Sequence, residues 1–157
     1  MLETNEIYGL SDDHLRGLAK ASADKFVVER EDIQRFTRRM WEVRRDGELI
    51  LCVGVMKLSP FSDPEIWLLF YVEFLKKFKM NLRGCRRLVN KLLEIYPKLR
   101  AHVAEHKYQD QRFAKFFGFK PSNVIDLMHD GKGYRRYNMA CTPCVPTIPS
   151  GEEKWLS

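Results

Sequence analysis

Long apolar runs are missing from this sequence of 157 residues. The two longest, Leu49–Met56 and Ile66–Val72, are far shorter than the roughly 20 residues that a helix needs to cross a bilayer. The sequence begins with an acidic stretch instead of an apolar one, so we expect no secretory signal peptide. These absences predict a protein without a membrane segment.

Cysteine is also scarce, with four residues in the chain. A chain of this length buries roughly 68–70% of its unfolded surface, so it folds without a disulfide framework and we expect thiols. Cys141 and Cys144 form a C-x-x-C pattern, but prolines inside and after it disfavour the helix that a redox-active pair begins. Cys52 and Cys85 stand alone in apolar segments, so we predict no metal site.

Positive charge is concentrated in one segment of a chain whose net charge is +6. Between Phe74 and Arg100 there are nine basic residues and one acidic residue. Such a patch attracts polyanions, among them nucleic acid, phosphate-bearing cofactors and acidic protein surfaces. With few aromatic residues for base stacking, contact with nucleic acid would be non-specific. The residues that we predict to contact a partner are Lys76, Arg83, Arg86, Arg87 and, near the C-terminus, Trp155.

The clearest periodic pattern lies in the same basic segment. Apolar residues recur at alternating spacings of three and four at Leu75, Phe78, Leu82, Cys85, Val89, Leu92 and Tyr96. This spacing predicts one long amphipathic helix, which Pro97 ends. Gly84 then lies inside the helix, where a glycine costs about 1 kcal/mol relative to alanine and marks close packing.

The other expected elements alternate between helices and strands. Asp46-Gly47 between two strand-like runs predicts a hairpin, and Gly118 suits the end of a helix. We expect helices after Ser11 and over Arg30–Met40 and Gln109–Phe117, strands over Trp41–Arg44, Leu49–Leu58, Ile66–Val72 and Leu99–Ala104, and a hairpin of Val124–Met128 with Tyr134–Met139. This order predicts an α/β (α+β) fold, in which helices flank a mixed, mostly antiparallel sheet. We expect one domain over residues 1–140 and a proline-containing tail over 141–157.

The order of elements resembles the GNAT superfamily of N-acetyltransferases. The most specific likeness is Phe113–Lys120, which is similar to the late helix of that family and its closing Tyr-x-x-x-Gly-Phe. Lys76–Leu99 and Arg112–Phe119 resemble, more closely, degenerate GNAT-like internal virion proteins of tailed bacteriophages. The resemblance implies a GNAT-like fold and a phage protein, located in the virion or the host cytoplasm.

The family binds the phosphates of acetyl-CoA in a loop with the pattern Arg/Gln-x-x-Gly-x-Gly/Ala. One alignment places Lys77, Met80 and Leu82 at the pattern positions and has no glycine. A later alignment includes Gly84 but interrupts the apolar stripe, so we prefer the first. The residues that the resemblance implies for a degenerate phosphate loop are Lys77, Lys79, Met80 and Asn81.

The family's usual general acid, a tyrosine of the late helix, corresponds here to Ala114, which cannot transfer a proton. Tyr108, Tyr134 or Tyr137 could replace it, and the sequence singles out none of them. We therefore predict no catalytic residue and no cofactor, in a chain that keeps the fold of the family but has lost acetyl transfer. On this hypothesis the chain is a virion-associated or assembly component that contacts other phage proteins.

Two other functions remain open. One is an acetyl-CoA-dependent N-acyltransferase, and the other is a basic module that binds nucleic acid or a host protein. The string from His102 to His106 matches the H-x-x-E-H pattern of a class of zinc proteases, which requires both histidines on one helix. We favour a strand ending in surface histidines at this position.

Overall fold

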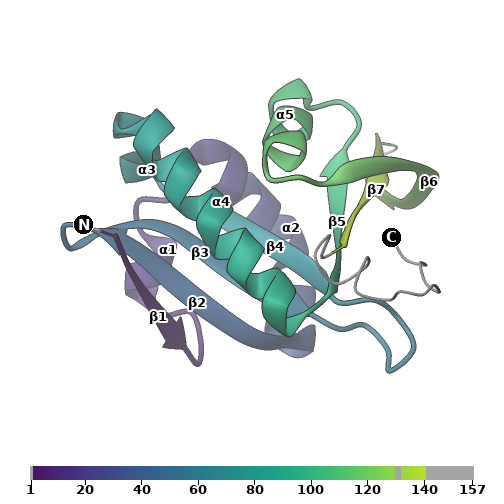
Figure 1. Cartoon of the computed structure of the whole chain (residues 1–157), viewed down its shortest axis with the longest axis horizontal. Coiled ribbons are helices and arrows are strands. Elements are labelled where there is room, and N and C mark those ends of the chain that lie inside the picture. The colour runs from purple at the N-terminus through teal and green to yellow at the C-terminus, as the bar shows by residue number, and fades with distance from the viewer. Residues whose placement is uncertain (1, 130–131, 141–157) are drawn as a thin grey trace, which may run out of the picture. The chain divides into compact units, whose positions relative to one another are not determined.

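The computed structural model describes residues 2–129 and 132–140. The chain forms two compact units, which are Met1–Ser62 with Ile66–Cys85 and Asp63–Glu65 with Arg86–Ser157 (Figure 1). Both contain helices and mostly antiparallel strands, so the predicted fold class is confirmed. Among the described residues, no helix is both long and apolar enough to cross a membrane.

The first unit is built on four adjacent strands. They are β1 (Leu2–Ile7), β2 (Thr37–Arg45), β3 (Glu48–Met56) and β4 (Glu65–Phe70), in that order across the sheet. β2 pairs antiparallel with both β1 and β3. The turn between β2 and β3 has positive φ at Asp46 and Gly47, at 52° and 85°, as expected of the hairpin that this dipeptide predicts. β1 was not predicted, because its polar sequence alternates too weakly.

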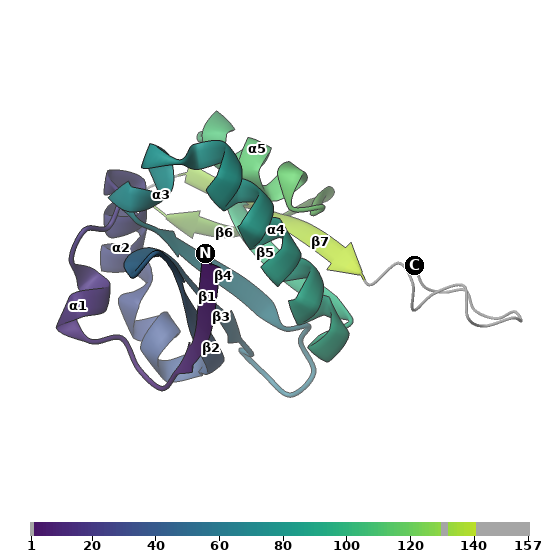
Figure 2. The same ribbon diagram turned by 60° about the vertical axis from the view of Figure 1, so that its left-hand side comes forward.

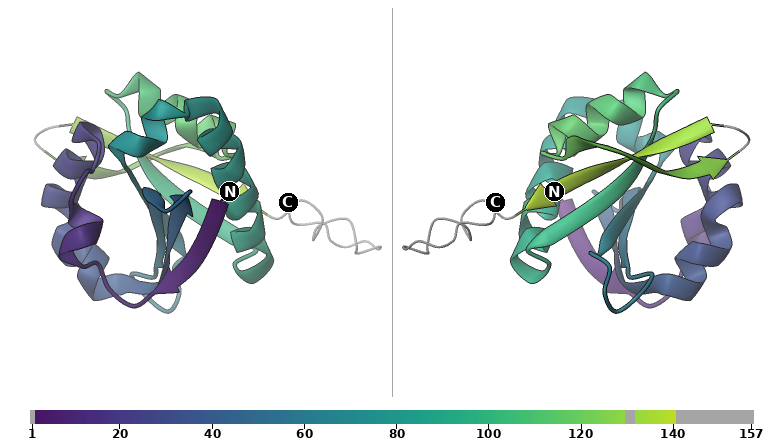
Figure 3. Two further views of the ribbon diagram at one scale, coloured as in Figure 1. Left: turned by 90° about the vertical axis from the view of Figure 1, so that its left-hand side faces the viewer. Right: turned by 90° about the vertical axis from the view of Figure 1, so that its right-hand side faces the viewer.

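Two helices lie on one face of these strands, and the first turns of α4 lie on the other (Figure 3). The two are α1 (Asp12–Leu15) and α2 (Lys20–Phe36). Phe26 and Ile33 of α2 pack with Trp67, Leu69 and Tyr71 in the core. The predicted helix over Arg30–Met40 is wrong at both ends. α2 starts earlier, at Lys20, and it ends at Phe36, because Thr37 already pairs with Met56 as the first residue of β2.

The long basic helix is interrupted near its start. α3 (Val72–Lys76) and α4 (Phe78–Ile95) are separated at Lys77, whose φ of −125° and ψ of 57° are not helical. Leu75, predicted to belong to the buried stripe, therefore sits on α3 and is 50% exposed. From Phe78 onward the predicted helix is confirmed, and its stripe is buried at Cys85, Val89 and Leu92.

Gly84 lies inside α4, as predicted. A Cβ atom at this position would come within 2.0 Å of Cδ1 of Leu2 on β1. The glycine therefore permits the close approach of helix and strand that the sequence suggested.

The second unit contains α5 and the remaining strands (Figure 2). They are β5 (Lys98–Ala104), α5 (Tyr108–Phe116), β6 (Lys120–His129) and β7 (Lys132–Ala140), with the strands in the order β5-β7-β6. Both pairings are antiparallel, and Glu65 pairs in parallel with Arg100. Gly118, with φ of 100°, follows α5 as predicted.

His102 lies on β5 and His106 in the turn after it, so the strand is confirmed and the helix of a zinc protease is excluded. The expectation of two surface histidines is wrong for His102, whose side chain is 7% exposed because it lies against the buried Glu65. Within residues 2–129 and 132–140, no group of three metal-ligating side chains could hold a metal ion. The C-x-x-C pattern, Trp155 and the whole predicted tail fall outside the described residues, so the division at residue 140 stays a prediction.

Candidate functional site

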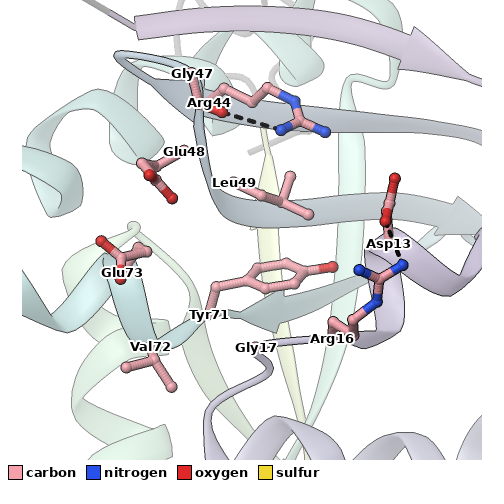
Figure 4. A pocket seen from close by; sticks show the side chains of 10 residues that line it. All are labelled: Asp13, Arg16, Gly17, Arg44, Gly47, Glu48, Leu49, Tyr71, Val72 and Glu73. Atoms are coloured by element: carbon pink, nitrogen blue, oxygen red, sulfur yellow. Dashed lines mark hydrogen bonds and ion pairs between the residues drawn. The ribbon is translucent and has the colours of Figure 1, made fainter.

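A pocket of about 360 Å³ lies in the first unit, at the residues that follow β4 (Figure 4). Three segments form it. They are α1 with the turn after it, the turn between β2 and β3, and the chain that leaves β4 for α3. The pocket therefore lies at the end of a buried central strand, where the chain reaches the surface.

The pocket combines apolar walls with charged groups. Leu49, Tyr71 and Val72 supply the apolar surface. The carboxylates of Glu48 and Glu73 lie on the same side of the pocket (Figure 4). The bond from Lys76 to Glu73, at 2.7 Å, and the weaker attraction of Glu48 raise the pKa of Lys76. Glu73 is therefore already paired with the ammonium group of Lys76, and Glu48 adds a second negative charge on the same side of the pocket.

One wall of the pocket is held by a buried polar network around Glu42. Its carboxylate accepts hydrogen bonds from His14 Nε2 at 2.9 Å, Arg44 Nε at 3.0 Å and Asn5 Nδ2 at 3.2 Å. The bond from Arg44 is the main reason that the pKa of Glu42 falls to about 2. His14 Nδ1 accepts from the backbone N–H of Ser11 at 3.0 Å, which leaves the ring proton on Nε2 for Glu42.

Tyr71 joins this network to the core. Its hydroxyl donates to the carbonyl oxygen of His14 and lies 3.4 Å from Sγ of Cys52. Burial raises the pKa of Tyr71, and burial also raises that of Cys52 to about 11. Tyr71 therefore keeps its proton. Two contacts hold α1 in place: the hydroxyl of Tyr71 binds the backbone carbonyl of His14, and the carboxylate of Glu42 binds the His14 ring.

The turn between α1 and α2 is paired with the end of β4. The backbone N–H of Tyr71 donates to Ile50 of β3 at 3.2 Å, so the N–H and C=O of its neighbours point to the opposite edge. On that edge Val72 N–H donates to Gly17 O at 2.8 Å, and Ala19 N–H donates to Phe70 O at 2.9 Å. We call Arg16–Ala19 the strap. It forms a short antiparallel bridge, centred on Leu18 and Tyr71, beside the pocket.

The residues predicted to form a phosphate loop lie together at the start of α4. Lys77 separates the two helices, and the exposed side chains of Lys79 and Met80 belong to the first turn of α4. Asn81 is buried, accepts from Arg45 Nε at 2.6 Å and donates to the carbonyl of Phe74 at 2.9 Å. Its amide therefore fastens α3 to α4, and the exposed positive charge comes from the two lysines.

The predicted partner residues on α3 and α4 are all exposed. They are Lys76, Arg83, Arg86 and Arg87. In the second unit, the guanidinium of Arg86 lies over the ring of Phe116, 5.3 Å from its centroid. These exposed side chains carry positive charge on α3 and α4, and their role in binding a partner stays a prediction.

The tyrosines proposed as replacement acids have different surroundings. Ala114 is buried on α5, Tyr108 is 72% exposed, and Tyr137 is buried, which raises its pKa. Nothing in the sequence singled out Tyr71, Glu48 or Glu73, which line the pocket. Tyr71 fell inside the predicted strand Ile66–Val72, where a tyrosine is ordinarily a core residue.

No protein-family model and no curated protein matches the sequence. Solved structures do match. A spermidine N-acetyltransferase chimera from Vibrio cholerae and its human counterpart has a TM-score of 0.63 and 16% identity, covering 90% of this chain and 96% of its own. An IAA acetyltransferase from Bacillus cereus has a TM-score of 0.61 and 15% identity, covering 89% and 99%. The chain has the GNAT fold. A Bacillus subtilis acetyltransferase solved in complex with CoA has a TM-score of 0.58 and 15% identity, covering 89% and 99%.

These likenesses correct two expectations. The hypothesis of a non-catalytic virion or assembly component is overturned, because the GNAT structures that the chain resembles are acetyltransferases. The expectation of no cofactor also finds no support, since one of these structures contains CoA. The finer likeness to phage proteins is not supported by these comparisons.

Proposed function

We propose that this chain is an acetyl-CoA-dependent N-acyltransferase that binds its acceptor amine in the pocket after β4. The observation that carries the proposal is the position of this pocket, at the residues that connect β4 to α4. Its carboxylates suit an amine, and the first turn of α4 suits the phosphates of the donor. The likeness of the fold to acetyltransferases that act on spermidine and on IAA supports acyl transfer as the reaction.

The acceptor end of the pocket fits an amine on a short apolar chain. Leu49 and Val72 offer surface to methylene groups, Glu48 offers charge to an ammonium group, and Glu73 does so when the substrate's ammonium displaces that of Lys76. A carboxylate within reach of the attacking nitrogen also accepts the proton that the amine must lose. The named substrate of one structural neighbour, spermidine, is an amine of this kind.

The donor end fits the phosphates of acetyl-CoA in part. An α-helix of 18 residues presents backbone N–H groups and a positive dipole at its start, and Lys77 and Lys79 add two charges there. Residues 72–83 contain no glycine, so we expect the phosphates to be held by lysine side chains more than by a close approach to the backbone. Acetyl-CoA supplies the acyl group as a thioester.

The test is a steady-state assay of CoA release from acetyl-CoA with a panel of amines, spermidine first. We expect Glu48→Gln and Glu73→Gln each to raise KM for the amine about tenfold, which one lost charge-assisted contact produces. Glu3→Gln, on β1 and outside the pocket, is the matched control and should leave KM unchanged. The proposal is wrong if calorimetry finds no saturable binding at millimolar acetyl-CoA.

The basic side of α4 carries a second proposal, that this surface binds a polyanionic partner. The exposed charges of Arg83, Arg86 and Arg87 support it. Arg83→Glu combined with Arg86→Glu should abolish retention on heparin and on double-stranded DNA, and wild-type binding should fall steeply with salt. Unchanged retention of this double variant would overturn the proposal.

A further inference from the structure

Helix α5 of the second unit carries aromatic and basic side chains in alternation. Tyr108, Arg112 and Phe116 are spaced by four residues, so they follow one another along one side of the helix over about 12 Å. The guanidinium of Arg112 lies over the ring of Tyr108, 5.8 Å from its centroid. Arg86 of α4 continues the series, because its guanidinium lies over the ring of Phe116 at 5.3 Å. We call Tyr108, Arg112, Phe116 and Arg86 the aromatic–basic row.

The two arginines of the aromatic–basic row can accept an anion as a partner. Both side chains are exposed. In the part of the chain that the structure describes, neither Arg86 nor Arg112 has a carboxylate partner. The attraction between each guanidinium and the ring beneath it stabilises the position of the cation. A guanidinium held in this way still has N–H groups in its plane that donate to phosphate oxygens.

The charge around the aromatic–basic row is mostly positive. Lys115 is exposed seven residues after Tyr108, on the same side of α5, and adds a third basic group. Asp110, the acidic residue of α5, is two residues from Tyr108 and therefore lies on a different side. Glu94, the acidic residue of α4, follows Arg86 by eight residues, which is about 12 Å along the helix. This surface therefore attracts polyanions.

The ring of Tyr108 indicates which polyanion fits. This side chain is 72% exposed, so much of its apolar ring is in contact with water. A base of a single strand can stack on such a ring and on the plane of an arginine. The bases of a duplex are already stacked on one another, and an acidic protein surface offers carboxylates without bases. The combination of ring and cation therefore favours a single strand over these other polyanions.

We infer that the aromatic–basic row binds single-stranded nucleic acid, with a base stacked on Tyr108 and phosphates held by Arg86 and Arg112. This inference rests on the second proposal above, that the basic side of α4 binds a polyanion, and it adds α5 and the kind of partner. The basic segment Phe74–Arg100 has few aromatic residues, so its sequence predicts contacts to phosphate alone. The additional rings come from α5, which meets α4 at Arg86.

The first measurement compares binding of an oligothymidylate and of a DNA duplex of the same length by fluorescence anisotropy. The wild type should bind the oligothymidylate more tightly. Tyr108→Ala should weaken this binding about tenfold, as expected for one lost stacked base, and should leave duplex binding unchanged. Tyr108→Phe keeps the ring and should bind like the wild type. Tyr8→Ala, at a tyrosine of the first unit that is 92% exposed, is the matched control and should change neither affinity.

The second measurement is the salt dependence of oligothymidylate binding. Arg86→Gln and Arg112→Gln should each reduce the slope of log affinity against log salt by about 0.7, the value for one phosphate contact of a single strand. Arg30→Gln is the control, because Arg30 is also exposed and lies over a ring, that of Phe26, but belongs to α2. Its slope should equal that of the wild type.

Equal affinity of the wild type for the two nucleic acids overturns the inference, and so does unchanged oligothymidylate binding by Tyr108→Ala. Competition by polyglutamate as strong as that by oligothymidylate overturns it in favour of an acidic protein. Retention on heparin that Arg83→Glu with Arg86→Glu abolishes would leave the second proposal standing in each case. Absence of binding to heparin and to both nucleic acids overturns both. Circular dichroism establishes that each variant is folded, and if Tyr108→Ala is not, the wild-type comparison and the slopes decide.

Discussion

Each unit of the molecule buries a glutamate beside a histidine and an arginine, and the two groupings differ in their geometry. In the first unit, three donors lie within 3.2 Å of the Glu42 carboxylate. In the second, Oε2 of Glu65 lies 2.8 Å from Nδ1 of His102, but Nε of Arg100 is 3.8 Å from Oε1. Among the residues that the structure describes, Glu65 Oε1 and Arg100 Nε have no hydrogen-bond partner.

The difference shows that burial alone does not make an ion pair strong. The side chain of Glu65 is 8% exposed and that of Glu42 is 12% exposed, so both lose most of their hydration. That loss is offset only where aligned donors replace water. Glu42 has such donors and fixes the helix beside the pocket. We therefore expect Glu42 to contribute much more to stability than Glu65.

The most direct way to break this comparison is to neutralise Glu42. Glu42→Gln should lower the free energy of unfolding by about 3 kcal/mol, because an amide cannot replace a carboxylate that accepts from both His14 and Arg44. Urea unfolding at pH 7 measures this. Glu3→Gln, on the exposed side of β1, is the control, and an equally small loss in both variants would contradict the prediction.

Low pH should remove the stabilisation that the charged carboxylate of Glu42 provides. The pKa of Glu42 is about 2 in the folded chain against an ordinary 4.5, so its charged form stabilises the fold above about pH 4.5. This contribution of about 3 kcal/mol should be lost as pH falls from about 4.5 to about 2. The difference in stability between the wild type and Glu42→Gln should therefore shrink by more than half between pH 7 and pH 3. A constant difference would show that the bonds to Glu42 do not depend on its charge.

A smaller difference in stability is expected between lysine substitutions at Arg44 and at Arg100. Arg44 contacts Glu42 through Nε at 3.0 Å and through a terminal nitrogen at 3.3 Å, and it also donates to Gly47 O at 3.1 Å. A lysine cannot reproduce this fork, so Arg44→Lys should cost about 1.5 kcal/mol. Arg100→Lys, at the poorly aligned pair, should cost clearly less in the same thermal unfolding experiment.

The smallest effect is expected at Glu65. Glu65→Gln should lower the free energy of unfolding by about 1 kcal/mol, because the amide oxygen can still face His102, the one group within 3 Å of this carboxylate, and the contact with Arg100 at 3.8 Å is weak from the start. Denaturant unfolding of this variant beside Glu42→Gln completes the comparison. A loss at Glu65 as large as that at Glu42 would show that distance to the charge matters more than alignment.

Features that are set by residues close together in the sequence could be predicted from the sequence. The Asp46-Gly47 turn, the buried positions Cys85 and Val89, and the glycine after α5 all occur where local chemistry placed them. The break at Lys77 did not follow, because the stripe passes through it without interruption. Nor did the pocket, whose charged and apolar groups come from three segments far apart in the chain.

The sequence by itself determined the order of most elements, the basic surface of α4 and the absence of glycine at its start. These properties are set within a few residues by periodicity, turn conformation and charge. The tertiary structure decided what the edge of β4 binds, that Gly17 and Val72 are partners, and which of two buried glutamates is well bonded. Backbone groups are alike at every residue, so only the assembled chain selects which of them meet.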